Sequence, residues 1–255
     1  MIPPPDTGAA DRPVSPRRII AADLHCDGSA RRVAMLEFLL KTCQEEQADC
    51  WLLGDLFDVW LGPGQLSLDM TRRELTALRR ATDSNVDVVV IPGNRDFLLD
   101  STFEEQTGVH VAGDHLQLET GGQRWHLSHG DLFGTADTGY LRLRRILRSS
   151  WFRWLARHLP MFVSRWLARM LRMGSRRALR HKEANRLKPD RDAIKQLIDA
   201  GYDRVVCGHF HRAQEERIDG DKEVGDFTVL EPFEDRGAHL FVEDGNLEMR
   251  YVEQS

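Results

Sequence analysis

Five short motifs rich in metal-binding residue types are spread over about 190 residues of this chain. Each follows a short apolar run of the kind that forms a buried strand. In chain order the motifs are Asp23-Leu24-His25, Gly54-Asp55, Gly93-Asn94-Arg95-Asp96, His129-Gly130-Asp131 and Gly208-His209-Phe210-His211. Ligands of open α/β sheets gather beyond the carboxyl ends of the strands. A fold that aligns these strand ends would therefore bring all five motifs into one crevice.

The first half of the chain predicts alternating strands and helices. Strands are expected at Arg18–Ala22, Cys50–Leu53 and Val86–Ile91, and helices at Ser29–Glu46 and Leu68–Ala81. In the first helix, the apolar residues on helical spacing are Val33, Leu36, Phe38, Leu39 and Leu40. This alternation implies right-handed crossovers and neighbouring, mostly parallel strands.

After Phe97 the pattern changes to short strands. These are expected at Val109–Val111, His115–Leu118, Arg124–Leu127 and Arg204–Cys207, with a helix at Arg191–Ala200 that ends at Gly201. Gly121-Gly122 predicts a hairpin turn, and Gln214–Val252 alternates short strands with glycines. The predicted fold class is α/β (α+β): a β-sandwich of two sheets packed face to face, with helices outside.

Composition gives little further constraint on the class of protein. The chain has 255 residues, 41% hydrophobic and 29% charged, which is ordinary for a globular protein. Residues 1–17 are proline-rich and lack an apolar stretch, so we expect a disordered lead-in rather than a secretory signal. The four cysteines form no C-x-x-C pair, which favours buried thiols in a reduced, cytoplasmic protein.

Seven side chains from the motifs are candidate metal ligands: Asp23, His25, Asp55, Asn94, His129, His209 and His211. In an extended segment Asp23 and His25 would point the same way and grip one cation. The Asp55 carboxylate has two oxygens and can bridge two cations, and Asn94 offers a neutral oxygen. Two adjacent cations clamp the attacking and leaving oxygens of a phosphorus centre. The ligand set therefore predicts a metal-dependent phosphoester hydrolase.

The ordered motif set resembles the calcineurin-like metallophosphoesterase superfamily. That resemblance implies a metallophosphoesterase-like fold and two metal sites. The first metal would be held by Asp23, His25, Asp55 and His211, and the second by Asp55, Asn94, His129 and His209. This mixed set of ligands for two divalent ions suits Mn²⁺.

Arg95 replaces the histidine that usually follows Gly-Asn in the third motif of the superfamily. An arginine side chain keeps its proton near neutral pH, so it cannot protonate a leaving group, but it can hold phosphate oxygens with two hydrogen bonds. A phosphate monoester, whose second pKa is about 6, leaves as an anion without a proton. This favours cleavage of a pyrophosphate bond over an alkyl phosphoester.

Residues 141–188 are strongly basic and predict an inserted helical cap. They hold thirteen Arg, two Lys and one Glu, a charge of +14, whereas the whole chain carries −5. Trp, Phe and Leu alternate with the arginines, which is typical of helices that lie on anionic membranes. We therefore expect peripheral binding to an anionic membrane surface, on its cytoplasmic side. Nucleic acid is not the expected partner because apolar residues are interleaved throughout; a lid that merely packs on the core is the alternative.

Longer stretches resemble the family of UDP-2,3-diacylglucosamine diphosphatases of the lipid A pathway. The similar stretches are Gly54–Trp60, Gly93–Leu99, His129–Tyr140, Leu159–Val163 and Lys182–Lys188. The resemblance implies Mn-dependent hydrolysis of a UDP-linked acylated glucosamine at the phosphorus nearer the uridine, giving UMP and 2,3-diacylglucosamine 1-phosphate. It implies a catalytic set of Asp55, Asn94, Arg95, His129 and His209. It implies a substrate-binding set of Asn94, Arg95, Asp137, Tyr140, Asn185, Lys188 and His209.

Two positions depart from that family. His181 stands where its members usually have serine, and Val229–Phe233 replaces a late L-G-x-W stretch. The acyl-chain length and the nucleotide stay open at this point. The alternatives are a related two-metal phosphoesterase for another nucleotide or lipid phosphodiester, and a catalytically dead membrane adaptor. The complete ligand set argues against the adaptor.

Overall fold

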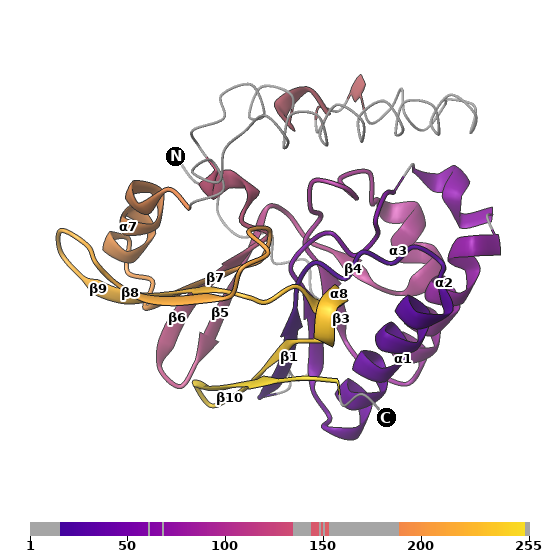
Figure 1. Cartoon of the computed structure of the whole chain (residues 1–255), viewed down its shortest axis with the longest axis horizontal. Coiled ribbons are helices and arrows are strands. Elements are labelled where there is room, and N and C mark those ends of the chain that lie inside the picture. The colour runs from indigo at the N-terminus through magenta and orange to yellow at the C-terminus, as the bar shows by residue number, and fades with distance from the viewer. Residues whose placement is uncertain are drawn as a thin grey trace.

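The structure is a computed structural model that describes residues 16–60, 62–67, 69–134, 144–147, 149, 151–152 and 189–252. Two sheets pack face to face, and helices cover their outer faces (Figure 1). The buried apolar residues form three clusters: one between the sheets, and one beneath the helices on each side. The predicted two-sheet α/β sandwich is confirmed.

The larger sheet has six strands in the order β11-β10-β1-β2-β3-β4. Its strands are β1 (Arg17–Ala21), β2 (Asp49–Leu52), β3 (Val88–Val90), β4 (His110–Val111), β10 (His239–Glu243) and β11 (Asn246–Arg250). The first four run parallel, whereas β10 pairs antiparallel with β1 and with β11. Its outer face is covered by α1 (Ala30–Glu45), α2 (Asp69–Asp83) and α3 (Ser101–Thr107), and a 3-10 turn, η1, spans Pro63–Ser67 (Figure 1).

The smaller sheet has five strands in the order β5-β6-β7-β9-β8. They are β5 (His115–Thr120), β6 (Gln123–Ser128), β7 (Arg204–Cys207), β8 (Gln214–Asp219) and β9 (Val224–Val229). β6, β7 and β9 are parallel, and the two outer pairs are antiparallel hairpins, including the one predicted at Gly121-Gly122. Helix α7 (Arg191–Asp199) packs on the outer face, and η2 spans Asp131–Phe133 (Figure 1).

Local sequence accounts for the first helix. The Ser29 side chain caps its first turn by accepting a hydrogen bond from the Arg32 N–H at 3.4 Å. Its buried stripe consists of Val33, Leu36, Leu39, Leu40 and Cys43. Phe38, which was grouped with these residues on helical spacing, lies outside the stripe: it is two positions from Leu36, on another side of the helix, and is 39% exposed.

The other predicted elements are confirmed to within a residue or two, and the C-terminal part adds a short helix. This helix, α8 (Phe233–Arg236), follows β9 where a late strand motif was considered. All four cysteines are buried and unpaired, as expected. In the part of the chain that the structure describes, no helix is long and apolar enough to cross a bilayer. Most of the predicted cap at 141–188, and the lead-in up to residue 15, lie outside the described residues.

The parallel strands of both sheets end at one edge, and each of the five motifs lies in the loop beyond one of these ends. Backbone hydrogen bonds join the loops to one another. The Asp23 N–H donates to Gly54 O at 3.2 Å, and the His25 N–H donates to Asp55 O at 2.9 Å. On the other sheet, the Gly208 N–H donates to His129 O at 3.0 Å. The predicted convergence of the motifs is therefore present.

Candidate metal centre

The backbone at the candidate ligands is strained. Among the described residues, eight non-glycine residues have positive φ, and five of these are candidate ligands: Asp23 (56°), His25 (48°), Asp55 (51°), His209 (72°) and His211 (51°). Such conformations cost about 1–3 kcal/mol each and cluster at functional sites. The expectation that Asp23 and His25 lie in an extended segment is wrong. Both residues hold left-handed backbone conformations instead, and hydrogen bonds join them to the neighbouring loop.

Two glycines let ligand side chains lie against the backbone. A Cβ atom at Gly93 would stand 2.2 Å from Asp55 Oδ1 and 2.4 Å from the Asp55 nitrogen. One at Gly54 would stand 2.4 Å from His129 Nδ1. Any larger residue at these positions would push a candidate ligand aside, which explains why glycine precedes Asp55 and Asn94.

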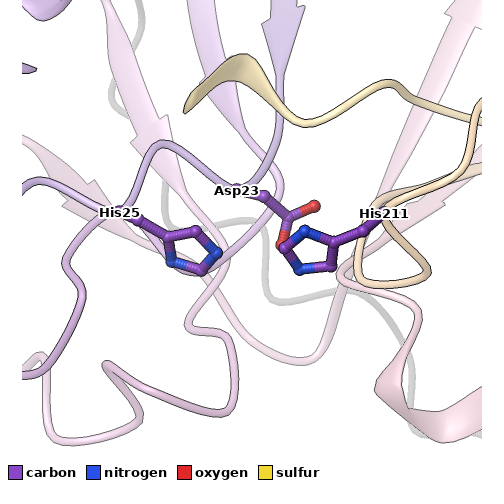
Figure 2. A group of neighbouring side chains, drawn as sticks. All are labelled: Asp23, His25 and His211. Carbon is purple, nitrogen blue, oxygen red and sulfur yellow. The ribbon is translucent and has the colours of Figure 1, made fainter. Parts of the chain in front are cut away.

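Asp23, His25 and His211 form the first ligand cluster (Figure 2). They come from loops 186 residues apart in sequence, and one candidate ligand atom from each lies within 4.8 Å of the others. Asp23 Oδ1 is 3.8 Å from His211 Nε2, and the two imidazole rings stack at 5.5 Å between centroids. Asp23 and His25 are buried, whereas the His211 side chain is 41% exposed.

Several buried atoms of this cluster are left without a hydrogen-bond partner among the described residues. They are Asp23 Oδ1 and both ring nitrogens of His25. Asp23 Oδ2, in contrast, accepts a hydrogen bond from the His209 N–H at 2.8 Å. Burial lowers the pKa of His25 to about 2, so its ring is neutral and carries a free lone pair. Unpartnered buried acceptors of this kind are what a cation would satisfy.

Asp55, Asn94, His129 and His209 form the second group. His129 Nδ1 lies 2.9 Å from Leu53 O, so we assign the proton there. Its Nε2 then faces Asn94 Oδ1 at 3.0 Å and Asp55 Oδ1 at 3.8 Å. The His209 ring packs edge-on against that of His129, at 4.9 Å between centroids. Nitrogen and oxygen donors therefore converge between these residues.

Electrostatics at the second group favour a cation. Burial raises the pKa of Asp55 to about 7; His129 opposes this shift, and Asp96 and Asp23 add to it. Burial alone would lower the pKa of His129, but the carboxylates of Asp55, Asp23 and Asp131 outweigh it and raise that pKa. Burial lowers the pKa of His209 to about 3, which leaves a neutral ring. Crowded buried carboxylates and neutral imidazoles fit divalent metals, and binding at His129 competes with a proton.

Arg95 lies beside this group and is held by two carboxylates. Its Nη1 donates to Asp58 Oδ1 at 2.6 Å, and its Nε is 3.4 Å from Asp55 Oδ2. Its backbone N–H donates to Asp55 Oδ1 at 2.9 Å. The guanidinium is 38% exposed, so it remains accessible to a substrate.

Asp96 accepts backbone hydrogen bonds from two of the motif loops. Its two carboxylate oxygens accept hydrogen bonds from the N–H groups of Gly93, at 2.6 Å, and Phe57, at 3.3 Å. Asp96 is fully buried, and burial raises the pKa of its carboxyl group. With both oxygens engaged by the backbone, Asp96 is a structural residue of the site.

The sequence reasoning missed two charged residues at the site and named four substrate residues that cannot be placed. Asp58 and Glu234 contact Arg95 and the two stacked histidines, respectively. Asp58 was visible only as part of a longer similar stretch, and Glu234 follows no motif. Asp137, Tyr140, Asn185 and Lys188 lie outside the described residues, so their predicted roles stay predictions.

The start of the basic block contacts two of the motif loops. Arg144, in a helical turn at residues 144–147, pairs through Nε with Asp131 Oδ2 at 2.7 Å and through Nη2 with Asp114 Oδ1 at 3.0 Å. The ring of Phe152 lies 6.5 Å from that of Phe97. Asp131 and Phe97 each follow a candidate site residue by two positions, so this block adjoins the site.

Fold, ligand clusters and motif order agree with one class of protein. The chain belongs to the calcineurin-like phosphoesterase family, whose model matches residues 16–213 and so spans all five motifs. It is accordingly a hydrolase of phosphorus–oxygen bonds with candidate sites for divalent metals.

Two relatives of about 30% identity have the same name. The UDP-2,3-diacylglucosamine hydrolase of Pseudomonas entomophila (strain L48) is 31% identical over 240 residues, which cover 93% of this chain and 99% of that protein. The enzyme of the same name from Pseudomonas aeruginosa (strain UCBPP-PA14) is 30% identical over 229 residues, covering 88% and 94%. Among solved structures, an archaeal phosphodiesterase aligns at 11% identity with a TM-score of 0.48, covering 92% of this chain and 99% of that one.

Proposed function

We propose that this chain hydrolyses the pyrophosphate bond of UDP-2,3-diacylglucosamine, giving UMP and 2,3-diacylglucosamine 1-phosphate. The observation that carries the proposal is the convergence of seven candidate ligands at one edge of the sandwich, with the Arg95 guanidinium beside Asp55. The names of relatives that align over most of the chain supply the substrate.

Two divalent ions, proposed to be Mn²⁺, fit this donor set, in which Asp23 Oδ1 and both ring nitrogens of His25 have no hydrogen-bond partner among the described residues. One would be held by Asp23, His25, Asp55 and His211, and the other by Asp55, Asn94, His129 and His209. When bound, such a pair supplies charge neutralisation at phosphorus and lowers the pKa of a water molecule. The mixture of imidazole, carboxylate and amide donors suits Mn²⁺.

Arg95 is proposed to bind the diphosphate and to select its leaving group. Asp58 and Asp55 fix the guanidinium at the edge of the second ligand group, so little side-chain freedom is lost when it meets phosphate oxygens. Arginine stays protonated at neutral pH and supplies charge without a proton. Substrates whose leaving group departs as a stable anion, such as a phosphate monoester, are therefore favoured.

The proposal includes a peripheral location on the inner face of the cell membrane, with residues 141–188 as a cap that takes up the acyl chains. Its support is the +14 charge of that block and the exposure of its described apolar residues. Ile146 is 49% exposed and Trp151 is 60% exposed. Their neighbours Arg144 and Phe152 contact the loops of the site. Acylated substrate and metal centre would thus share one edge of the molecule.

The test is hydrolysis of UDP-2,3-diacylglucosamine with Mn²⁺ in ¹⁸O-labelled water, followed by phosphorus NMR. The expected products are UMP that carries the label and an unlabelled sugar phosphate. Label in the sugar phosphate would refute attack at the phosphorus nearer the uridine. Turnover of other nucleotide or lipid phosphodiesters, with none of this substrate, would overturn the substrate assignment in favour of a related phosphoesterase. Asn94→Ala is the inactive control.

A further inference from the structure

Glu234 contacts all three residues of the first ligand cluster, although no motif marks it. Its backbone N–H donates to Asp23 O at 3.2 Å. Its carboxylate Oε1 lies 3.8 Å from His25 Nε2 and 3.8 Å from His211 Nδ1. Glu234, 209 positions from His25 in sequence, is therefore placed against both stacked rings and the backbone of Asp23.

Arg32 fixes the orientation of that carboxylate. Its Nη2 is 2.7 Å from Glu234 Oε2, and its Nη1 donates to the backbone carbonyl of Glu234. The side chains of Arg32 and Glu234 are only 17% and 24% exposed. Because Arg32 engages Oε2, the other oxygen, Oε1, is the one turned toward the imidazoles. Arg32 lies in the first turn of α1, directly after the first motif, so the pair ties α8 to the ligand loop.

The two nitrogens of the His211 ring face different partners. Nε2 faces Asp23 Oδ1, where the first cation would bind, and Nδ1 faces Glu234. A neutral imidazole carries one proton, and each ring nitrogen faces a carboxylate oxygen at 3.8 Å. A cation at Asp23 would take the Nε2 lone pair and leave the proton at Nδ1, where the Glu234 carboxylate stabilises it. His211 is 41% exposed, so packing alone does not fix its ring.

We propose that Glu234 is a positioning residue of the metal centre, which sets the tautomer and orientation of His211. At 3.8 Å the contact is electrostatic rather than a hydrogen bond; a small movement of the His211 ring toward Glu234 on metal binding would make it an N–H···O hydrogen bond. The inference rests on the metal centre and not on the identity of the substrate. The proposal also gives a role to Val229–Phe233, the stretch that departs from the usual late-strand motif. This stretch leads into α8, which carries Glu234.

The test is to measure Mn²⁺ binding to chelator-treated protein by calorimetry. Glu234→Ala is expected to weaken the first site about 10- to 100-fold, the usual effect of losing such a partner, and to leave the second site within about twofold. Glu234→Gln keeps an acceptor for the Nδ1 proton and should lose less. Glu231→Ala is the matched control. It removes a carboxylate from the same segment, but this carboxylate pairs with Arg236, at 2.9 Å.

A double-mutant cycle separates positioning from direct ligation. If Glu234 acts through His211, adding Glu234→Ala to His211→Ala should change the affinity less than twofold. The inference would be overturned if Glu234→Ala lowered the Mn²⁺ affinity of the His211→Ala variant as much as that of wild type. It would also be overturned if Glu234→Ala alone left the affinity unchanged. Nitrogen NMR of the Zn²⁺-loaded protein gives a second readout: His211 should be protonated at Nδ1, and protonation at Nε2 would refute it. If UDP-2,3-diacylglucosamine is not hydrolysed but these results hold, only the substrate proposal fails.

Discussion

Replacing Asp55 with asparagine is expected to stabilise the metal-free protein at high pH while destroying its metal centre. Asp55 is 2% exposed, and burial raises its pKa from 3.8 to about 7. Folding therefore favours the protonated carboxyl group. The stability linked to this group is fully present below pH 3.8 and is lost as the pH rises through 7.

The size of the effect follows from the width of that pH window. A shift of one pKa unit corresponds to about 1.36 kcal/mol, so the three units between 3.8 and about 7 amount to roughly 4 kcal/mol. Asparagine has no charge to bury and keeps an oxygen for the Arg95 N–H. The free energy of unfolding of the variant, minus that of wild type, should therefore rise by roughly 4 kcal/mol between pH 4 and pH 8. His25, whose lowered pKa costs stability as the pH falls below 6.5, affects both proteins equally and cancels.

The assay is urea unfolding of both metal-free proteins at several pH values, monitored by circular dichroism. Repeating it with saturating Mn²⁺ should stabilise wild type by RT ln(1 + [Mn²⁺]/Kd) and the variant far less. A difference between the two proteins that stays constant with pH would refute the protonated carboxyl group. Equal stabilisation of both by Mn²⁺ would refute Asp55 as a bridging ligand.

Three further perturbations test separate parts of the site. Gly93→Ala should abolish Mn²⁺ binding in calorimetry because its Cβ would stand 2.2 Å from Asp55 Oδ1, whereas Gly113→Ala, which meets nothing within 4 Å, should bind normally. Arg95→Lys should lower kcat about 10-fold or more with unchanged metal content, because lysine cannot make the planar two-point contact with phosphate; wild-type turnover would contradict this role. Arg144→Ala should lower the free energy of unfolding by about 1.5–3 kcal/mol, because Asp131, 3% exposed, loses a 2.7 Å hydrogen bond to a charged group. Arg144→Met combined with Asp131→Asn should recover much of that loss; a cost that the double variant does not relieve would rule out the ion pair as its origin.

The positions of the candidate ligands were predictable because each follows an apolar strand. Buried strands have a strong local signal, and parallel strands joined by helices align their carboxyl ends. Asp55, Asn94, His129 and His209 are therefore close in space as expected. The conformation of the first motif was not predictable. The left-handed backbone conformations of Asp23 and His25 depend on hydrogen bonds to Gly54 and Asp55, which lie in the loop after another strand.

Residues that reach the site by long-range packing are not marked by a motif of their own. Glu234 arrives on a four-residue helix that follows β9, and its place depends on Arg32 and on the backbone of Asp23. Asp58 meets Arg95 only because two loops from neighbouring strands lie together. Phe38 shows the reverse case, since it is apolar but lies outside the buried stripe of its helix. A single sequence locates a strand-end motif but not the partners that tertiary packing delivers to it.

The metal-free centre stores unfavourable free energy that the rest of the fold must offset. Five ligand residues hold left-handed backbone conformations at about 1–3 kcal/mol each, and Asp23 and Asp55 are buried carboxylates. Opposing this, the apolar clusters between and outside the sheets hold the strands, and hydrogen bonds between the motif loops fix their ends. If these contacts hold the ligands in place without an ion, metal binding relieves repulsion instead of ordering the chain. We therefore expect circular dichroism spectra with and without Mn²⁺ to coincide while the midpoint of urea unfolding rises with Mn²⁺ concentration; a spectrum that gains structure on Mn²⁺ addition would show that the site forms only on binding.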